Sequence, residues 1–158
     1  MNRRNFLCPM AFLVMIIGWF PAVAGGQATP PDQMSIQGEI LSRYSSFEGS
    51  GEEQTWEKWQ DYFMRSPDIA NLHGTHLEIG WETYREGSLA YYDRPAEDRA
   101  AVRFEDLQVH LIDESTAWVT GVFVNIIGER EMRPLFYDVL KKTSNGWQVF
   151  FSYVALHR

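Results

Sequence analysis

Cysteine and clustered basic residues are scarce in this sequence, and each shortage excludes a class of protein. The chain has one cysteine, Cys8, so it cannot form an intramolecular disulfide. Its 14 basic and 21 acidic side chains give a net charge of −7, which argues against a nucleic-acid partner. The sequence has no glycine-rich phosphate loop, Ser/His/Asp nucleophile pattern or dinucleotide-binding fingerprint. We therefore expect no cofactor.

The first residues have the pattern of an export signal. Arg3 and Arg4 precede an almost wholly apolar run at residues 6–20, and Ala-Val-Ala at 22–24 provides the small residues of a cleavage site. The run is shorter than the roughly 20 residues that span a bilayer. We therefore predict a signal peptide at residues 1–24 and no stable membrane span after its removal.

Export would change both the chain and its compartment. Residues 3–7, Arg-Arg-Asn-Phe-Leu, resemble a twin-arginine signal, while the apolar run also suits the Sec route, so both routes stay open. The expected location is periplasmic or secreted, in a bacterium. Cleavage would remove Cys8 and leave a thiol-free, acidic chain with a short lead-in at residues 25–33 and one domain at 34–158.

Aromatic residues make up 15% of the chain, and in its first half they recur at helical spacing. Two such stripes are Ile36, Ile40, Tyr44, Phe47 and Trp56, Trp59, Phe63. A third helix is predicted over residues 81–92, where Asp93-Arg94-Pro95 ends it.

Between the second and third helices the sequence predicts a short hairpin. Gly74-Thr75 suits a type II′ turn, which would pair His73 with His76 and Asn71 with Glu78 on one face. The other face is predicted to be a core face, with Ala70, Leu72, Leu77 and Ile79. His73 then points either to water or to a polar pocket. His73, His76 and Glu78 could bind a metal, but they match no established spacing, and we expect no metal.

The second half is predicted to consist of strands at residues 102–113, 117–127, 132–142 and 147–157, joined by short polar turns. Such runs form an antiparallel meander. Asn145-Gly146 favours a type I′ turn between the last two strands. Helices followed by a curved sheet predict an α+β domain.

This order of elements, ending in Gly-Trp-Gln-Val-Phe-Phe-Ser-Tyr at residues 146–153, resembles the NTF2-like superfamily and especially its SnoaL-like and ketosteroid isomerase-like branches. The resemblance runs from about residue 34 to the end. It implies a cone in which the sheet wraps the helices and leaves a pocket at the open end. That fold hosts isomerases, cyclases, dehydratases and proteins without known chemistry, so the resemblance implies the fold more strongly than a function.

Asp138 is an acidic residue that the strand pattern places among apolar ones. A two-residue Asn145-Gly146 turn predicts three pairs on one face: Asp138 with Tyr153, Leu140 with Phe151, and Phe136 with Ala155. Desolvation there would raise the pKa of the Asp138 carboxyl. In ketosteroid isomerases an acid at this distance before the turn glycine donates a hydrogen bond to the substrate oxyanion, and the resemblance implies that role here. A structural hydrogen bond with Tyr153 is the alternative.

The resemblance implies two further catalytic positions. Ser42-Arg43-Tyr44 before Gly49 is similar to the segment that supplies the second oxyanion donor, although Tyr44 also fits the buried stripe of its helix. Those isomerases place a catalytic aspartate five residues beyond the aspartate that starts the first strand. Counted from Asp68, that position holds His73, and histidine can be a general base near neutral pH.

Three functions remain open. The first is a domain that binds a small, largely apolar molecule without chemistry. Its predicted pocket is lined by Trp59, Phe63, Trp81, Tyr84, Phe136, Phe151 and Tyr153. The second is a cofactor-free isomerase, cyclase or dehydratase, in which Tyr44 and Asp138 polarise a carbonyl and His73 moves the proton. The third is a dimeric structural or accessory module.

Both faces of the predicted sheet are apolar. The face opposite Asp138 is predicted to carry Leu135, Tyr137, Val139, Phe150, Val154 and Leu156. An antiparallel sheet with one solvated face alternates apolar and polar residues, and the helices can cover one face only. We therefore predict a homodimer packed sheet to sheet, as the resemblance also implies, with Arg133 at its rim.

Overall fold

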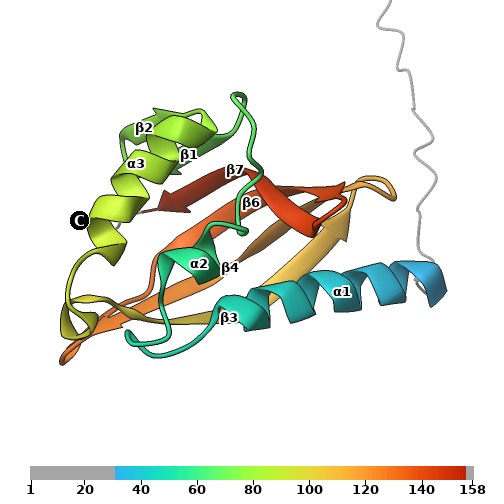
Figure 1. The fold of residues 1–158 in the computed structure, drawn as a ribbon. Helices are drawn as coiled ribbons and strands as arrows, with labels where there is room; N and C mark the ends of the chain where they lie inside the picture. Colours follow the sequence, from blue (N-terminus) through green and yellow to red (C-terminus); the bar gives the residue numbers. More distant parts are fainter. Residues whose placement is uncertain (1–30, 156–158) are drawn as a thin grey trace, which may run out of the picture.

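The computed structural model describes residues 31–155, so the predicted signal peptide lies outside the described residues. The helical elements are α1 (Pro31–Phe47), α2 (Trp56–Trp59), α3 (Trp81–Tyr92) and the 3₁₀ turn η1 (Ala96–Asp98). The strands are β1 (Ala70–His73), β2 (His76–Ile79), β3 (Ala101–Leu111), β4 (Thr116–Ile127), β5 (Arg130–Met132), β6 (Leu135–Thr143) and β7 (Gly146–Ala155). The helices lie on one side of a curved sheet (Figure 1), which confirms the predicted α+β class. No helix in this part of the chain is long and apolar enough to cross a membrane.

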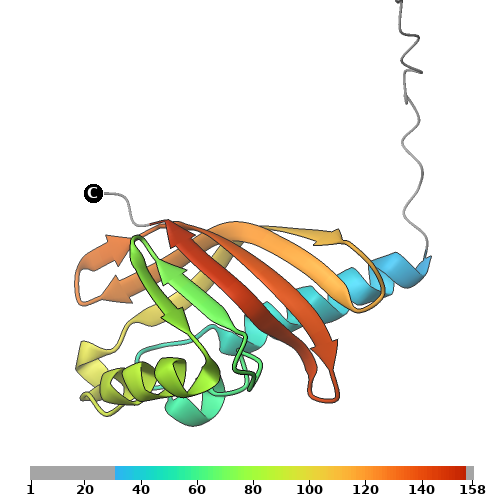
Figure 2. The same ribbon diagram turned by 90° about the horizontal axis from the view of Figure 1, so that it is seen from above.

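The strands form one sheet in the order β2-β1-β7-β6-β4-β3, with β5 paired to β4 outside this path. The pairs are antiparallel except for β1 with β7, which are parallel. The last strand therefore lies between the early hairpin and the meander (Figure 2). This order places residues near position 70 directly beside residues near position 150.

Helix α1 begins at Pro31, three residues before the predicted domain boundary, and ends at Phe47, the last residue of the predicted stripe. Its stripe of Ile40, Tyr44 and Phe47 is buried. These side chains pack against the concave side of the sheet, with Tyr44 against Phe104 of β3 at a ring distance of 4.9 Å. The 3.6-residue period of the helix keeps all of them on that one side.

The second predicted helix is shorter than its aromatic spacing suggests. Thr55 caps α2 by accepting from the Lys58 amide at 3.3 Å, but the helix ends after one turn. The backbone beyond it bonds to β7 instead, because the amide of Val149 donates to Tyr62 and the amide of Met64 donates to Val149. Phe63 therefore belongs to an isolated bridge with the sheet and not to a helix.

The turn between β6 and β7 differs from the prediction. Thr143 pairs with Gly146, so the two turn residues are Ser144 and Asn145. Only Gly146 has a positive φ, at 87°, whereas a type I′ turn at Asn145-Gly146 needs positive φ at both residues. The glycine instead follows the two turn residues, a pattern typical of a type I turn with a bulge.

A second irregularity at Phe150 then fixes the register of the rest of this hairpin. Asp138 pairs with Ser152, not with the predicted Tyr153, and Leu140 pairs with Val149. A shift of one residue moves every side chain to the other face. Phe151 and Tyr153 therefore lie on the outer face of the sheet, and Val154 lies on the inner face.

Local breaks in the strands curve the sheet. The register of β3 with β4 shifts between Glu105 and Gln108, where Asp106 has a φ of 54°. Gly121 lies opposite this bulge, and a Cβ there would come within 2.8 Å of the Glu105 carbonyl oxygen. Pro134, which has no N–H to donate, separates β5 from β6 in what was predicted as one strand.

The hairpin β1–β2 has the predicted register but the opposite burial. His73 pairs with His76, and Gly74 has a φ of 58° at the turn. The predicted core face carries Leu77 and Ile79, which are 51% and 59% exposed. The helices lie on the other side of the sheet, so the polar face of this hairpin is the one that faces inward.

Candidate functional site

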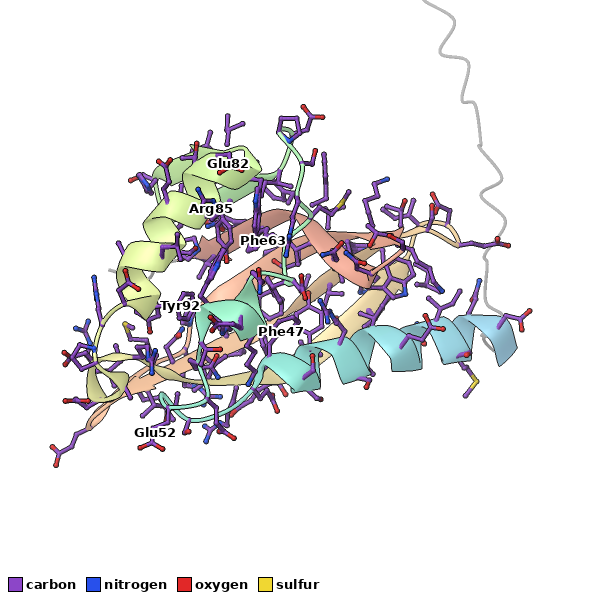
Figure 3. All side chains as sticks on the ribbon, viewed as in Figure 1. Phe47, Glu52, Phe63, Glu82, Arg85 and Tyr92 are labelled. Carbon is purple, nitrogen blue, oxygen red and sulfur yellow. The ribbon has the colours of Figure 1, made fainter. Side chains whose placement is uncertain are left out.

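A cavity of about 460 Å³ lies between the inner face of the sheet and the segment that carries α2 and α3. Phe63 and Tyr92 lie on the side of α3 that faces the sheet (Figure 3). Most of the wall is aromatic or aliphatic and includes Trp59, Phe63, Tyr84, Tyr92, Phe104, Phe123, Phe136 and Val154. Ligand sites typically combine such a wall with a few placed polar groups.

Asp138 of β6 is held in this cavity by two tyrosines. Its Oδ2 accepts hydrogen bonds from the hydroxyl of Tyr44 at 2.7 Å and from that of Tyr62 at 2.6 Å. All three residues are buried, and Asp138 is 1% exposed. Tyr44 comes from α1 and Tyr62 from the segment after α2, so three distant parts of the chain position one carboxyl group.

Burial raises the pKa of Asp138 from 3.8 to about 6, because the carboxylate loses its hydration. The hydroxyls of Tyr62, Ser152 and Tyr44 oppose this rise by stabilising the charged form. Burial, followed by the charge of Asp138, raises the pKa values of Tyr44 and Tyr62 well above their usual range. Both tyrosines therefore stay protonated at neutral pH and act as donors to the carboxyl.

Asp138 is one end of a row of four polar residues that crosses the inner face of the sheet. Strand pairing places Glu78 of β2 beside Asn71 of β1, Asn71 beside Ser152 of β7, and Ser152 beside Asp138. We call these four residues the polar row, and all four line the cavity. Asn71, Ser152 and Asp138 are buried, whereas Glu78 at the edge of the sheet is half-buried.

The amide of Asn71 links the row to Glu78. Its Nδ2 donates to Glu78 Oε2 at 3.0 Å, which leaves Asn71 Oδ1 without a hydrogen-bond partner among the described residues. Glu78 Oε1 lies 3.7 Å from His76 Nε2. Gly87 of α3 leaves room for this carboxylate, since a Cβ there would come within 3.0 Å of Glu78 Oε1.

His73 and His76 lie at the exposed end of the cavity, beside the polar row. Partial burial lowers the pKa of His73, and the charge of Glu78 opposes that effect. A neutral imidazole can accept a proton. His73 both lines the mouth of the cavity and is exposed to solvent, so the position of its side chain combines the two outcomes that the sequence left open, water and a polar pocket.

The predicted site residues do not all reach the cavity. His73, Asp138, Trp59, Phe63, Tyr84 and Phe136 line it. Tyr44 lies behind Asp138, its hydroxyl already donating to the carboxyl. Trp81 stacks on Trp56 at 5.7 Å, outside the cavity wall. Phe151 and Tyr153 are on the outer face, where Tyr153 stacks on Tyr137 at 6.4 Å.

Sequence reasoning missed Tyr62, Asn71 and Ser152 as members of the site. Tyr62 is three residues beyond Trp59, so its spacing was a usable signal for an inward side chain. Asn71 was already paired with Glu78, but nothing in the local sequence indicates that β1 would lie beside β7. Ser152 was placed on the wrong face by the error in register.

The site offers acid–base and hydrogen-bonding chemistry in an apolar surround. Asp138 can carry a proton or a charge near neutral pH, and His73 can accept a proton at the mouth. Residues 31–155 contain no group of three or more His, Cys, Asp or Glu side chains placed to bind a metal.

Solved structures of similar fold exist, although no family model and no curated protein matches the sequence. An NTF-2 like protein of unknown function from Shewanella oneidensis superposes with a TM-score of 0.68 at 11% identity, over 76% of this chain and 98% of that one. An NTF2-like superfamily protein from Salmonella enterica gives 0.62 at 14% identity, over 78% and 92%. A putative aromatic ring hydroxylase from Novosphingobium aromaticivorans gives 0.59 at 13% identity, over 84% and 93%.

These identities are too low to carry a function or a branch from one protein to another, and the SnoaL-like and ketosteroid isomerase-like branches remain a prediction. The fold can be compared at these identities, because the superpositions cover nearly the whole length of those proteins. Helices against a curved sheet with a cavity between them agree with those structures and with the resemblance of the sequence. This chain has the fold of the NTF2-like superfamily.

Proposed function

We propose that this chain is an exported domain that binds a small, largely apolar molecule in its aromatic-lined cavity. The observation that carries the proposal is the cavity of about 460 Å³, walled by aromatic side chains, with the buried polar row on one side. This volume lies within the range of small-molecule sites. The polar row supplies orientation, and the aromatic wall supplies most of the buried apolar surface.

Native mass spectrometry of protein purified under gentle conditions tests the proposal, because a bound molecule would add a discrete mass that is lost on denaturation. A matched pair of variants locates it. Ser88→Trp fills the cavity from α3, whereas Ala90→Trp adds the same side chain on the exposed side of that helix. We expect the added mass to disappear in Ser88→Trp alone. Equal retention in both folded variants would contradict the proposed site.

Export is the second part of the proposal, and it rests on the sequence of residues 1–24. The mature protein would begin after Ala24, in the periplasm or outside the cell. Amino-terminal sequencing of protein from the periplasmic fraction of a bacterial host checks both points. Full-length protein retained in the cytoplasm would contradict it.

We also propose a homodimer formed through the outer face of the sheet. Three large apolar side chains on β4 and β6 support it, since Leu135, Tyr137 and Trp118 are 46%, 45% and 39% exposed. Arg133 forms ion pairs with Glu105 and Glu131 of its own chain at one side of this face, as suits a polar rim.

A proton-transfer enzyme acting on a carbonyl compound is the second candidate, favoured by the presence of Asp138 and His73 in one cavity wall. Asp138 would touch the substrate oxygen, His73 would move the proton, and Tyr44 would position the acid. Asp138→Asn keeps a donor and should retain much of any isomerase activity, whereas Asp138→Leu should abolish it. Equal losses in both variants would contradict the oxyanion role.

A further inference from the structure

The polar row presents more hydrogen-bond acceptors to the cavity than residues 31–155 satisfy. Asp138 Oδ1 and Asn71 Oδ1 are both buried and have no hydrogen-bond partner among residues 31–155. The orientation of the Asn71 amide is fixed by Glu78, because a carboxylate oxygen can accept only from the Nδ2 side. Buried polar atoms without partners are uncommon and costly, so two in one row, of which the Ser152 hydroxyl can satisfy only one, point to a missing donor.

The donors within the row cannot supply both atoms. Ser152 lies between Asn71 and Asp138 on neighbouring strands, and its hydroxyl has a single proton. The Asn71 amide nitrogen is already directed to Glu78, and the two tyrosine hydroxyls are directed to the other oxygen of Asp138. At least one acceptor therefore stays free whichever way the Ser152 hydroxyl turns.

The carboxylates of the cavity favour a positive partner. Among residues 31–155, Asp138 and Glu78 line the cavity together with His73 and His76, and no Lys or Arg side chain lines it. A buried carboxylate is stabilised by an opposite charge within hydrogen-bond distance. The aromatic rings of the opposite wall, such as those of Tyr84 and Tyr92, can also attract a cation through their faces.

We propose that the ligand of this cavity carries a protonated amine on an apolar body, with the ammonium group donating to Asp138 and Asn71 across Ser152. Glu78 acts from the mouth by adding negative charge and by fixing the Asn71 amide. This inference rests on the proposed binding function and narrows its ligand to an organic cation. It differs from the carbonyl ligand of the enzyme candidate, which needs donors from the protein where this row offers acceptors.

Four probes that share one apolar body test the proposal. They are 2-(1-naphthyl)ethylamine, 2-(1-naphthyl)ethanol, 1-naphthylacetone and 1-naphthylacetate, titrated by calorimetry into the full mature protein at about pH 7.5. Because hydrogen bonds to charged groups are the stronger ones, we expect the amine to bind about tenfold more tightly than the alcohol. The ketone should bind more weakly still, and the carboxylate should bind least.

Two variants assign the preference to the polar row. In Asp138→Asn the amide oxygen must accept from the tyrosines, so its nitrogen faces the cavity as a donor, and amine affinity should fall at least tenfold. Glu78→Gln keeps an acceptor for Asn71 and removes a charge at a half-buried site, so a loss of about threefold is expected there. Glu57→Gln removes the same charge from an exposed position outside the cavity and should change nothing.

The outcomes separate this inference from the binding function on which it rests. Tightest binding of the amine, lost in Asp138→Asn and not in Glu57→Gln, supports the inference. Equal or tighter binding of the ketone or carboxylate overturns it but leaves the cavity as a binding site. Unchanged amine affinity in both row variants also overturns it. If the folded protein binds none of the probes and carries no co-purified molecule, both proposals fail.

Discussion

The two faces of the sheet are formed by the same strands but differ in the polarity and the exposure of their side chains. The inner face, toward the helices, holds a row of polar residues among aromatic ones, and Asp138 in that row is 1% exposed. The outer face is largely apolar, yet the adjacent residue Tyr137 is 45% exposed. This arrangement reverses the usual preference of polar groups for water and apolar groups for the interior.

The reversal indicates what each face lacks. The inner face has free acceptors for which residues 31–155 supply no donor, and the outer face has exposed apolar side chains of the kind found in protein interfaces. These two features are the basis for proposing a ligand at the inner face and a partner subunit at the outer face. If the two faces have these different roles, substitutions on them should differ in their effects on the free energy of unfolding and on assembly.

The largest expected difference between the faces is in packing. Phe136 and Tyr137 are neighbours on β6, with Phe136 buried against Tyr44 and Phe104 and Tyr137 directed outward. Phe136→Ala should lower the free energy of unfolding by about 4 kcal/mol through the cavity that it leaves. Tyr137→Ala should cost less than about 1 kcal/mol in the monomer. Urea unfolding at low protein concentration checks both, and similar costs would contradict the difference.

The acid of the inner face should make stability depend on pH. The folded-state pKa of Asp138 is about 6, above its ordinary value of 3.8, so the folded chain binds this proton more tightly than the unfolded chain. The stabilisation is therefore complete below about pH 3.8 and is lost as the pH rises through 6. At about 1.4 kcal/mol for each pKa unit, the loss amounts to about 3 kcal/mol.

Asp138→Asn isolates this effect because the other titrating groups cancel in the comparison. The unfolding free energy of the variant minus that of the natural chain should rise by about 3 kcal/mol between pH 3 and pH 7. Denaturant titrations at a series of pH values measure it. A difference that stays flat would show that the pKa of Asp138 is the same in the folded and unfolded chain, and the inner face would then contribute no pH-dependent stability.

Sequence reasoning reached the fold because its strongest signals are local. The stripe of Ile40, Tyr44 and Phe47 lies within one helix, and the Gly74-Thr75 turn fixes its hairpin by itself. Asp138 was also found locally, since it alternates with Phe136 and Leu140 along one strand. That alternation places the side chain of Asp138 on the inner face of the sheet, and this holds for any residue of β7 that pairs with it.

The rest of the site depends on contacts between distant segments. The predicted register of β7 was wrong because the turn residues were misplaced and because the irregularity at Phe150 was not foreseen. The prediction therefore paired Asp138 with Tyr153, whereas its partner is Ser152. Tyr62 reaches Asp138 because the chain leaves α2 early to bond with Val149. The spacing of Tyr62 from Trp59 indicates an inward side chain, but neither its contact with Asp138 nor the register of β7 has a signal in the nearby sequence. Both are decided by which backbone groups meet across the fold.

The two tyrosines behind Asp138 provide a smaller and more specific test of the inner face. Tyr44→Phe or Tyr62→Phe removes one donor to a carboxylate, which should cost about 2 kcal/mol above pH 6. Each change should also raise the pKa of Asp138 above 6, since the charged form loses a hydrogen bond. Carbon-13 NMR of the labelled carboxyl measures that pKa. Tyr92→Phe, which removes a hydroxyl elsewhere in the cavity wall, should leave it unchanged.

The smallest effect on stability is expected on the outer face, where the effect on assembly should be complete. Tyr137→Asp places a charge within the apolar face of the proposed two-fold interface, whereas Met34→Asp adds the same charge to an exposed apolar site on α1. Each should change the unfolding free energy of the monomer by less than about 1 kcal/mol. Sedimentation equilibrium at micromolar concentration should show dimers for the natural chain and Met34→Asp, and monomers for Tyr137→Asp. A monodisperse natural monomer would mean that the exposed apolar face is tolerated in water, and the outer face would then carry no requirement for a partner.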